Sequence, residues 1–174
     1  MKIFSDPLPR FLVTALLLYT GWYCAYEFWI HPTQSLDGLV VQNTINISKK
    51  ILEGFGYSVS QPETRLLKIE GTGGVFVSDS CNGIPLFVLF SIFIIAFPGP
   101  WKKKIIFIPA GIVLIHAANI ARVVALAMIQ HKNREWVEFN HTYTFTILMY
   151  AFIFIMWMLW VKKFSGISFN TDKT

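Results

Sequence analysis

Four runs of apolar residues, separated by polar or basic segments, restrict this chain more than any other feature of its sequence. As α-helices, runs of about 20 residues are long enough to cross the roughly 30 Å hydrocarbon layer of a bilayer. The second run is short, but with its flanking residues it can span if the bilayer thins or neighbours cover its ends. The runs predict transmembrane helices at about 11–30, 84–98, 104–129 and 141–161. We therefore expect an all-α integral membrane protein in which residues 1–174 form a single membrane domain.

The composition agrees with burial in lipid. Only 14% of the residues are charged, whereas soluble proteins carry roughly 25%. The net charge of +5 does not indicate nucleic acid as a partner, because the basic residues gather at the ends of apolar runs. The only two cysteines, Cys24 and Cys81, are far apart, and the sequence contains neither a phosphate loop nor a metal-ligand motif. We expect membrane lipids as partners, and no cofactor or metal.

The basic residues predict the orientation. In a four-helix arrangement, one side of the membrane receives Lys2, Arg10, Lys102 to Lys104, Lys162 and Lys163. On the other side the basic residues are mixed with acidic ones. Because positive loops stay in the cytoplasm, we expect both termini there and the polar loops outside. The first run has no small-residue cleavage site, so we expect it to remain as a helix.

Residues 31–80 form the one large polar insertion, which this orientation places outside the cytoplasm. Apolar residues at helical spacing predict an amphipathic helix over Asp37–Glu53. Leu66–Glu70 and Val75–Val77 predict two strands of a hairpin, which would deliver the chain to Cys81. A short polar segment follows Lys163, and we expect it to be a disordered tail.

Cys81 lies where this insertion meets the second apolar run, in the stretch Asp79-Ser80-Cys81-Asn82-Gly83-Ile84-Pro85. Proline is favoured in the first turn of a helix, so we expect Cys81 at the positive N-terminal end of a membrane helix. Such a position favours a thiolate and holds a developing oxyanion. Asn82 and Gly83 would then support the site. An inert cysteine at a helix end has the same local sequence, and that alternative stays open here.

Arg122 lies inside the third apolar run, where insertion of an arginine costs roughly 2.5–3.5 kcal/mol. Such residues usually face a polar cavity. His116 and Asn119 precede Arg122 at spacings of three, on one broad helix face, and we expect both to support the site. The alternative is structural, with Arg122 reaching the surface or pairing with Glu27.

His141 opens the fourth run and would stand at the same outer level as Cys81 and Arg122. His131 is also available, but it falls in a loop beside a lysine. A cysteine nucleophile needs a base or a cation nearby. With His141 moving protons and Arg122 stabilising negative charge, the three side chains suit acyl transfer through a thioester.

The order of these motifs resembles the exosortase/archaeosortase family. The resemblance rests on Ser80-Cys81-Asn82-Gly83-Ile84, on Asn119-x-x-Arg122 within a membrane helix, and on His141 at the start of the next helix. It covers roughly Ser80 to Tyr150. This chain would be a short member, because many members have about twice as many spans. Asn82 stands where a smaller Ser or Thr is expected.

The resemblance implies a membrane cysteine transpeptidase or protease that cleaves C-terminal sorting signals of exported proteins. Cys81, Arg122 and His141 would be its catalytic residues. Its substrates would carry a C-terminal transmembrane segment followed by basic residues. Cleavage would occur at the outer face of a bacterial cytoplasmic membrane.

Two other functions fit the same sequence. One is a non-catalytic membrane assembly protein in which Cys81 is inert and Arg122 pairs with Glu27. The other is a transporter-like protein that uses Arg122 to bind an anion or a lipid head group.

Overall fold

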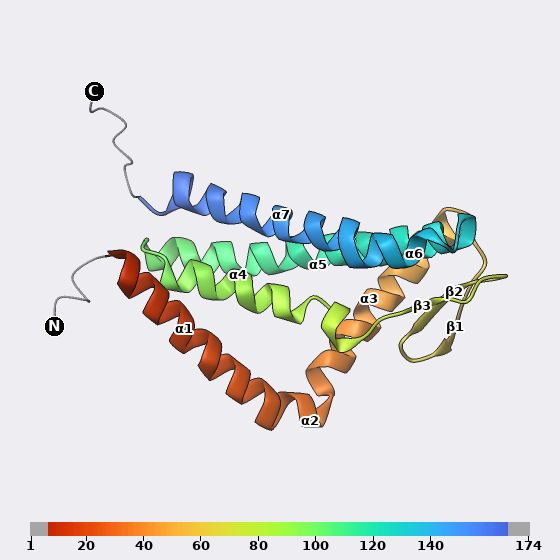
Figure 1. Ribbon diagram of the computed structural model, residues 1–174, viewed down its shortest axis with the longest axis horizontal. Helices are drawn as coiled ribbons and strands as arrows, with labels where there is room; N and C mark the ends of the chain where they lie inside the picture. Colours follow the sequence, from red (N-terminus) through yellow and green to blue (C-terminus); the bar gives the residue numbers. More distant parts are fainter. Residues whose placement is uncertain (1–6, 167–174) are drawn as a thin grey trace.

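The computed structural model describes residues 7–166 and shows a mostly helical protein with a small sheet at one end (Figure 1). Lys2 and most of the tail predicted after Lys163 lie outside the described residues. The helical segments are α1 (Pro7–Ala25), the π-helical turn η2 (Tyr26–Ile30), α2 (His31–Thr33), α3 (Ser35–Gly54), the 3-10 turn η3 (Asp79–Cys81), α4 (Ile84–Ala96), α5 (Trp101–Lys132), α6 (Trp136–Phe139), the π-helical turn η4 (Asn140–Thr144), α7 (Phe145–Leu159) and the π-helical turn η5 (Trp160–Phe164).

Two helices of the described chain are long and apolar enough to cross a membrane, namely α5 and the continuous helix Trp136–Phe164. The latter consists of α6, η4, α7 and η5. α4 is apolar but shorter, and α1 is not among the candidate spans. The structure thus supports the third and fourth of the predicted spans, and the total of four stays a prediction.

These two helices extend beyond the spans predicted at about 104–129 and 141–161. α5 runs over Trp101–Lys132 and not 104–129, because lysine is a good helix former and continues the helix at both ends. The fourth helix begins at Trp136, five residues before His141. At the other predicted spans, α4 ends at Ala96 and α1 is followed by the π-helical turn η2.

The sheet has three antiparallel strands in the order β1 (Val59–Glu63), β2 (Leu66–Ile69) and β3 (Val75–Phe76). The predicted hairpin is confirmed as β2 and β3, in the register Leu66 opposite Phe76. The sequence prediction missed β1. Pro62 lies within that strand, and proline argues against a strand unless the strand is at an edge.

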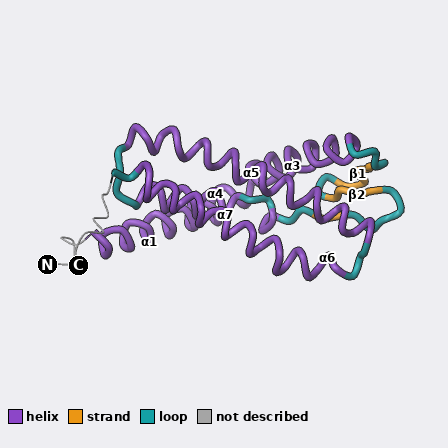
Figure 2. The backbone as a smooth tube through the Cα atoms, turned by 90° about the horizontal axis from the view of Figure 1, so that it is seen from above, coloured by secondary structure: helices purple, strands orange, loops and turns teal. Residues whose placement is uncertain are grey.

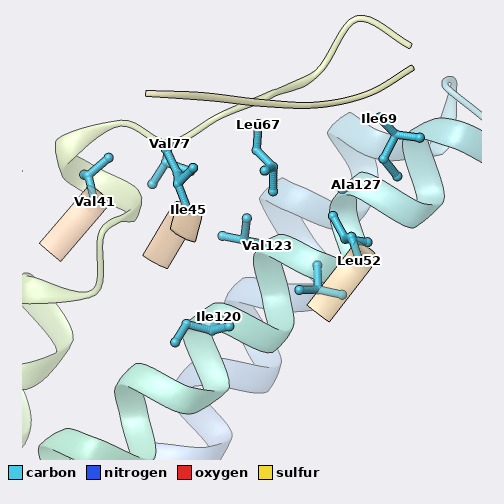
Figure 3. Close-up of a cluster of buried hydrophobic side chains, with 10 residues drawn as sticks. Val41, Ile45, Leu52, Leu67, Ile69, Val77, Ile120, Val123 and Ala127 are labelled. Atoms are coloured by element: carbon cyan, nitrogen blue, oxygen red, sulfur yellow. The ribbon is translucent and has the colours of Figure 1, made fainter. Parts of the chain in front are cut away.

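The predicted amphipathic helix is confirmed as α3, which packs along the C-terminal half of α5. Its buried face and one face of the sheet enclose a cluster of aliphatic side chains against α5. Figure 3 shows Leu67 and Ile69 of the sheet above Val123 and Ala127 of α5. This packing fixes the sheet relative to α5, and therefore fixes the segment that follows β3.

The sheet and α6 lie at one end of the molecule, and the loop between α4 and α5 lies at the other (Figures 1 and 2). The start of α1 and the end of the last helix share that second end, which also carries Lys102 to Lys104. η3, with Cys81, lies between the sheet and the start of α4.

Candidate active site

The turn that carries Cys81 is stabilised by a backbone hydrogen bond and by the side chain of Asn82. The Cys81 N–H donates to the Ser78 carbonyl at 3.0 Å. Asn82 Oδ1 accepts a 2.9 Å bond from the Ile84 N–H, an Asx-type turn that leads into α4. Gly83 takes a φ of 93°, a conformation that glycine adopts without strain. An added Cβ at this glycine would come within 3.3 Å of the Phe87 ring.

This local structure refines the prediction that Cys81 lies at the N-terminal end of a membrane helix, close to free backbone N–H groups. Cys81 belongs to η3, and α4 begins three residues later, at Ile84. The N–H of Ile84 is bonded to Asn82, and that of Leu86 is bonded to the Gly83 carbonyl. Pro85 has no N–H. The helix end therefore offers fewer donors for an oxyanion than predicted.

The structure brings Cys81, His141 and Arg122 together from three separate segments. Cys81 Sγ lies 3.2 Å from His141 Nε2. The guanidinium of Arg122 approaches the same sulfur, with Nη2 at 3.9 Å. Arg122 Nη2 also lies 3.5 Å from the backbone carbonyl of His141. A thiol thus has an imidazole and a fixed positive charge as immediate neighbours.

Asn119 and Arg122 reach the Cys81 turn from the same face of α5. Asn119 is fully buried, and its Nδ2 donates to the Cys81 carbonyl at 3.1 Å. It therefore holds the backbone next to the thiol. Among the described residues no ion pair joins Arg122 to Glu27, so the geometry gives no support to that structural alternative.

His141 lies inside the π-helical turn η4, and not at a helix start as predicted. Such turns within α-helices are frequent at functional sites because they displace side chains from the regular spacing. Thr146 Oγ1 donates to the His141 carbonyl at 3.2 Å. The other candidate, His131, instead packs edge-on against the Tyr57 ring, with the ring centroids 5.3 Å apart.

His116 lies apart from this group. Its Nε2 bonds to Asn43 Oδ1 at 2.8 Å, which links α5 to α3. Its ring faces Phe87 edge-on at 6.0 Å. These contacts are those of a helix-packing residue, and no described hydrogen bond connects His116 to Cys81, Arg122 or His141.

A buried carboxylate beneath the turn was missed by the sequence prediction. Asp37 of α3 is fully buried, and its Oδ1 accepts bonds from Asn82 Nδ2 at 2.6 Å and from the Tyr26 hydroxyl at 2.9 Å. Asn82 is fully buried as well, so it supports the turn from below and does not face a ligand. One signal existed: Asp37 precedes Val41 and Ile45 at spacings of four, on the apolar face of α3.

A second set of charges ties the turn to the insertion. Arg65, next to β2, forms a short ion pair with Asp79 of η3. Its other guanidinium nitrogen donates to Gln34 Oε1 at 2.7 Å. His31 Nε2 stands 3.9 Å from the second oxygen of Asp79. These contacts join the β1–β2 connection, the residue before α3 and η3.

Two hollows lie beside the three central side chains, and both reach His141. One, of about 290 Å³, is lined by Cys81, Arg122 and His141 together with Leu86, Met149 and Tyr150. The other, of about 300 Å³, reaches from His141 to the sheet and the C-terminal end of α5. The first hollow gives a substrate access to the sulfur. Among the described residues, no group of three His, Cys, Asp or Glu side chains could hold a metal ion.

Fold and site together define a helical membrane protein with a thiol, an imidazole and a guanidinium at one point. A family model described as "Transmembrane exosortase" matches residues 7–161, and the chain belongs to this family. No curated protein and no solved structure matches the chain. Membership indicates a function related to protein sorting at the membrane, in a family generally made of cysteine transpeptidases.

Proposed function

We propose that this protein is a membrane cysteine transpeptidase or protease that cleaves C-terminal sorting signals of exported proteins. One observation carries the proposal: Cys81 Sγ lies 3.2 Å from His141 Nε2. This is the contact that a nucleophile and its general base require. The Arg122 guanidinium at 3.9 Å from the same sulfur adds a fixed charge where negative charge develops.

In the first half-reaction, His141 Nε2 takes the proton of the Cys81 thiol, and the sulfur attacks a peptide carbonyl carbon of the substrate. The carbonyl oxygen becomes an oxyanion, which Arg122 stabilises. When the intermediate collapses, the C–N bond breaks and His141 returns the proton to the leaving amine. The products are a thioester on Cys81 and the released C-terminal fragment.

In the second half-reaction, an amine or a water molecule attacks the thioester carbon, with His141 as the base. The C–S bond breaks, and the thiol regains its proton from the imidazolium. An amine gives transpeptidation and water gives hydrolysis. Both outcomes use the same three side chains, because the acceptor enters where the first leaving group departed.

For the cellular setting, we propose a bacterial cytoplasmic membrane with the site facing outward and both termini in the cytoplasm. The support is the basic end formed by Lys102 to Lys104 with Lys162 and Lys163, opposite the sheet. The substrates would be proteins with a C-terminal transmembrane segment, held in the same lipid bilayer. They would meet Cys81 at the junction of apolar helices and the polar insertion.

Trapping of the thioester tests the proposed activity. The protein is expressed with an exported protein of the same cell that ends in an apolar helix and basic residues. We expect a thiol-sensitive adduct with wild type, none with Cys81→Ala, and a weakened one with Arg122→Ala. Cys24→Ala is the matched control and should behave as wild type, because Cys24 is exposed and the cysteine that contacts His141 is Cys81.

The two other functions give different results in the same assay. If Cys81→Ala still processes the partner, the enzyme proposal fails and a non-catalytic assembly role takes its place. If Cys81→Ala keeps function while Arg122→Ala abolishes it, Arg122 acts as an anion or lipid head-group site.

A further inference from the structure

Strand β3 has an open edge beside the candidate active site. The Val77 N–H donates to the Arg65 carbonyl at 2.9 Å, and Leu66 stands opposite Phe76. In an antiparallel pair, hydrogen-bonded and non-bonded residues alternate. The N–H and C=O of Phe76 therefore point away from β2, and its ring is 57% exposed.

The two edge strands of the sheet differ in whether they can pair with a further strand. β1, which is the other edge, contains Pro62, and proline on an edge strand discourages pairing with a further strand. β3 contains no proline and leads within five residues to Cys81. The edge left open for pairing is the one next to the thiol.

The hollow along β3 lies next to the site. It is lined by Gly74, Val75 and Phe76 on one side, and by residues of α5 and the fourth helix on the other. A cleft of about 10 Å³ lies between this hollow and Cys81, and it shares Val75, Phe76, Leu126 and His141 with the hollow. The hollow on the far side of Cys81 shares Arg122 and His141 with that cleft.

Both hollows combine polar and apolar side chains. The hollow along β3 contains Arg134, Glu138 and Gln130, whose Oε1 is buried without a hydrogen-bond partner among the described residues. The hollow beyond Cys81 is bordered by Leu86, Met149 and Tyr150, and also by Thr142 and Thr146. An extended polypeptide fits both, because its main chain offers polar groups and its side chains can be of either kind.

We propose that the substrate adds an extended segment as a fourth strand on the open edge of β3, an inference that rests on the proposed function. Main-chain bonds to Phe76 hold this segment, and the buried Gln130 oxygen accepts a further N–H from it. The apolar part of the substrate continues past Cys81 between α4 and α7. Backbone pairing at the edge thus sets which peptide bond lies over the sulfur.

Disulfide cross-linking tests the pairing directly. The probe is the C-terminal segment of an exported protein that the wild type cleaves, carrying one cysteine at successive positions. The protein carries Phe76→Cys with Cys24→Ser and Cys81→Ala, so that the probe stays uncleaved. We expect cross-links at alternate probe positions, because side chains on one face of a strand recur every second residue. The control is Glu63→Cys in β1, an exposed position near the other edge, where we expect none.

A backbone variant measures the strength of the pairing. Phe76→Pro removes the N–H that faces the open edge and leaves the ladder to β2 intact. Its matched control is Phe76→Val, which changes the ring but keeps the donor and the strand preference. We expect cleavage of the probe to fall roughly tenfold with Pro, and to stay within about twofold of wild type with Val. Labelling of Cys81 by a small thiol reagent should be the same in both variants and shows that the site is still folded.

The outcomes separate this inference from the proposed function. If wild type and Cys81→Ala process the probe equally, the proposed function fails. If cleavage requires Cys81 but cross-links are absent or recur every third or fourth residue, only the strand pairing is overturned. Equal cleavage by Phe76→Pro and Phe76→Val, with Cys81 still labelled, overturns it as well.

Discussion

The two ends of the bundle are packed with different side chains. The cluster at the sheet end, here called the outer cluster, lies between α3, the sheet and the C-terminal half of α5; it comprises Val41, Ile45, Leu52, Leu67, Ile69, Val77, Ile120, Val123, Val124 and Ala127. The cluster toward the α4–α5 loop, here called the inner cluster, lies between α4, α5 and the last helix; it comprises Phe90, Ile94, Ile115, Met149, Ile153, Met156 and Trp160. The outer cluster is wholly aliphatic. The inner one is surrounded by stacked rings, such as Phe93 on Trp157 at 4.3 Å.

The cluster beside the sheet positions the candidate active site. The outer cluster joins segments far apart in the sequence, and one of them, β3, leads directly to Cys81. The inner cluster joins helices whose association in lipid depends on close packing and not on exclusion of water. We therefore expect disturbance of the outer cluster to alter the chemistry, and disturbance of the inner cluster to alter stability alone.

The largest effect is expected from two cations of the same helix, one in each region. Arg122→Ala removes the charge beside Cys81 Sγ and should lower the rate of thioester formation about 10²- to 10³-fold, with little change in stability. Lys104→Met removes the buried ammonium that bonds the Ile95 and Phe97 carbonyls at 2.8 and 2.7 Å. It should cost about 1–3 kcal/mol of stability and leave the rate per folded molecule unchanged.

Single-turnover rates and unfolding in detergent measure the two quantities separately. Arg122→Lys provides a further control, since it keeps the charge but loses the planar, forked donor; its rate should fall between those of wild type and Arg122→Ala. A normal rate in Arg122→Ala, or a lost rate in Lys104→Met, would show that the two ends do not divide chemistry from stability.

A second pair of variants compares two buried aliphatic side chains of equal burial. Leu67 of β2 is fully buried in the outer cluster, and Ile153 of α7 is 1% exposed in the inner one. Truncation to alanine should cost about 2–5 kcal/mol at each site. Leu67→Ala should also slow thioester formation, because it loosens the sheet that leads to Cys81. Ile153→Ala should not.

Thermal melting would give the stability of both variants, and probe cleavage at a temperature where both are folded would give the rate. Equal rates in the two variants would contradict the idea that the outer cluster sets the geometry of the turn. Slowing by Ile153→Ala alone would reverse the assignment.

The gathering of the three central side chains could be predicted from the sequence because each leaves a physical signal. An arginine in an apolar run is costly, so Arg122 indicates a polar cavity. A cysteine before an apolar run that opens with proline indicates a helix start, and the approach of His141 followed from the order of the spans. The π-helical turn around His141 left no such signal. Hydropathy is averaged over a whole span, so it does not reveal a single helical turn that contains one more residue than usual.

The features that the sequence prediction missed depend on contacts between segments far apart in the chain. β1 was missed because Pro62 argues against a strand, and only pairing with β2 shows that the strand is at an edge. Asp37 was missed because an acidic residue near a helix start usually serves the helix dipole. Its role appears only when α3 lies against Asn82. The four-span total rested on hydropathy, and α4 and α1 fall short of the length or apolarity of α5.

The smallest effect is expected at Asn82, on the border between the two regions. Its Oδ1 accepts the Ile84 N–H at the turn into α4, and its Nδ2 donates to Asp37 of α3. Asn82→Ala should cost about 1 kcal/mol from the lost turn hydrogen bond and leave the buried carboxylate with one donor fewer. Asn82→Ser keeps an oxygen for the turn but lacks the amide donor, so it should be the milder variant. Because the turn is also held by the Asn119 bond to the Cys81 carbonyl, we expect both variants to cleave the probe within tenfold of wild type.

Unfolding in detergent measures the loss of stability in these variants, and single-turnover cleavage measures the rate. A larger loss of rate in Asn82→Ala than in Arg122→Ala would mean that the position of the Cys81 turn, and not the charge beside it, limits the reaction.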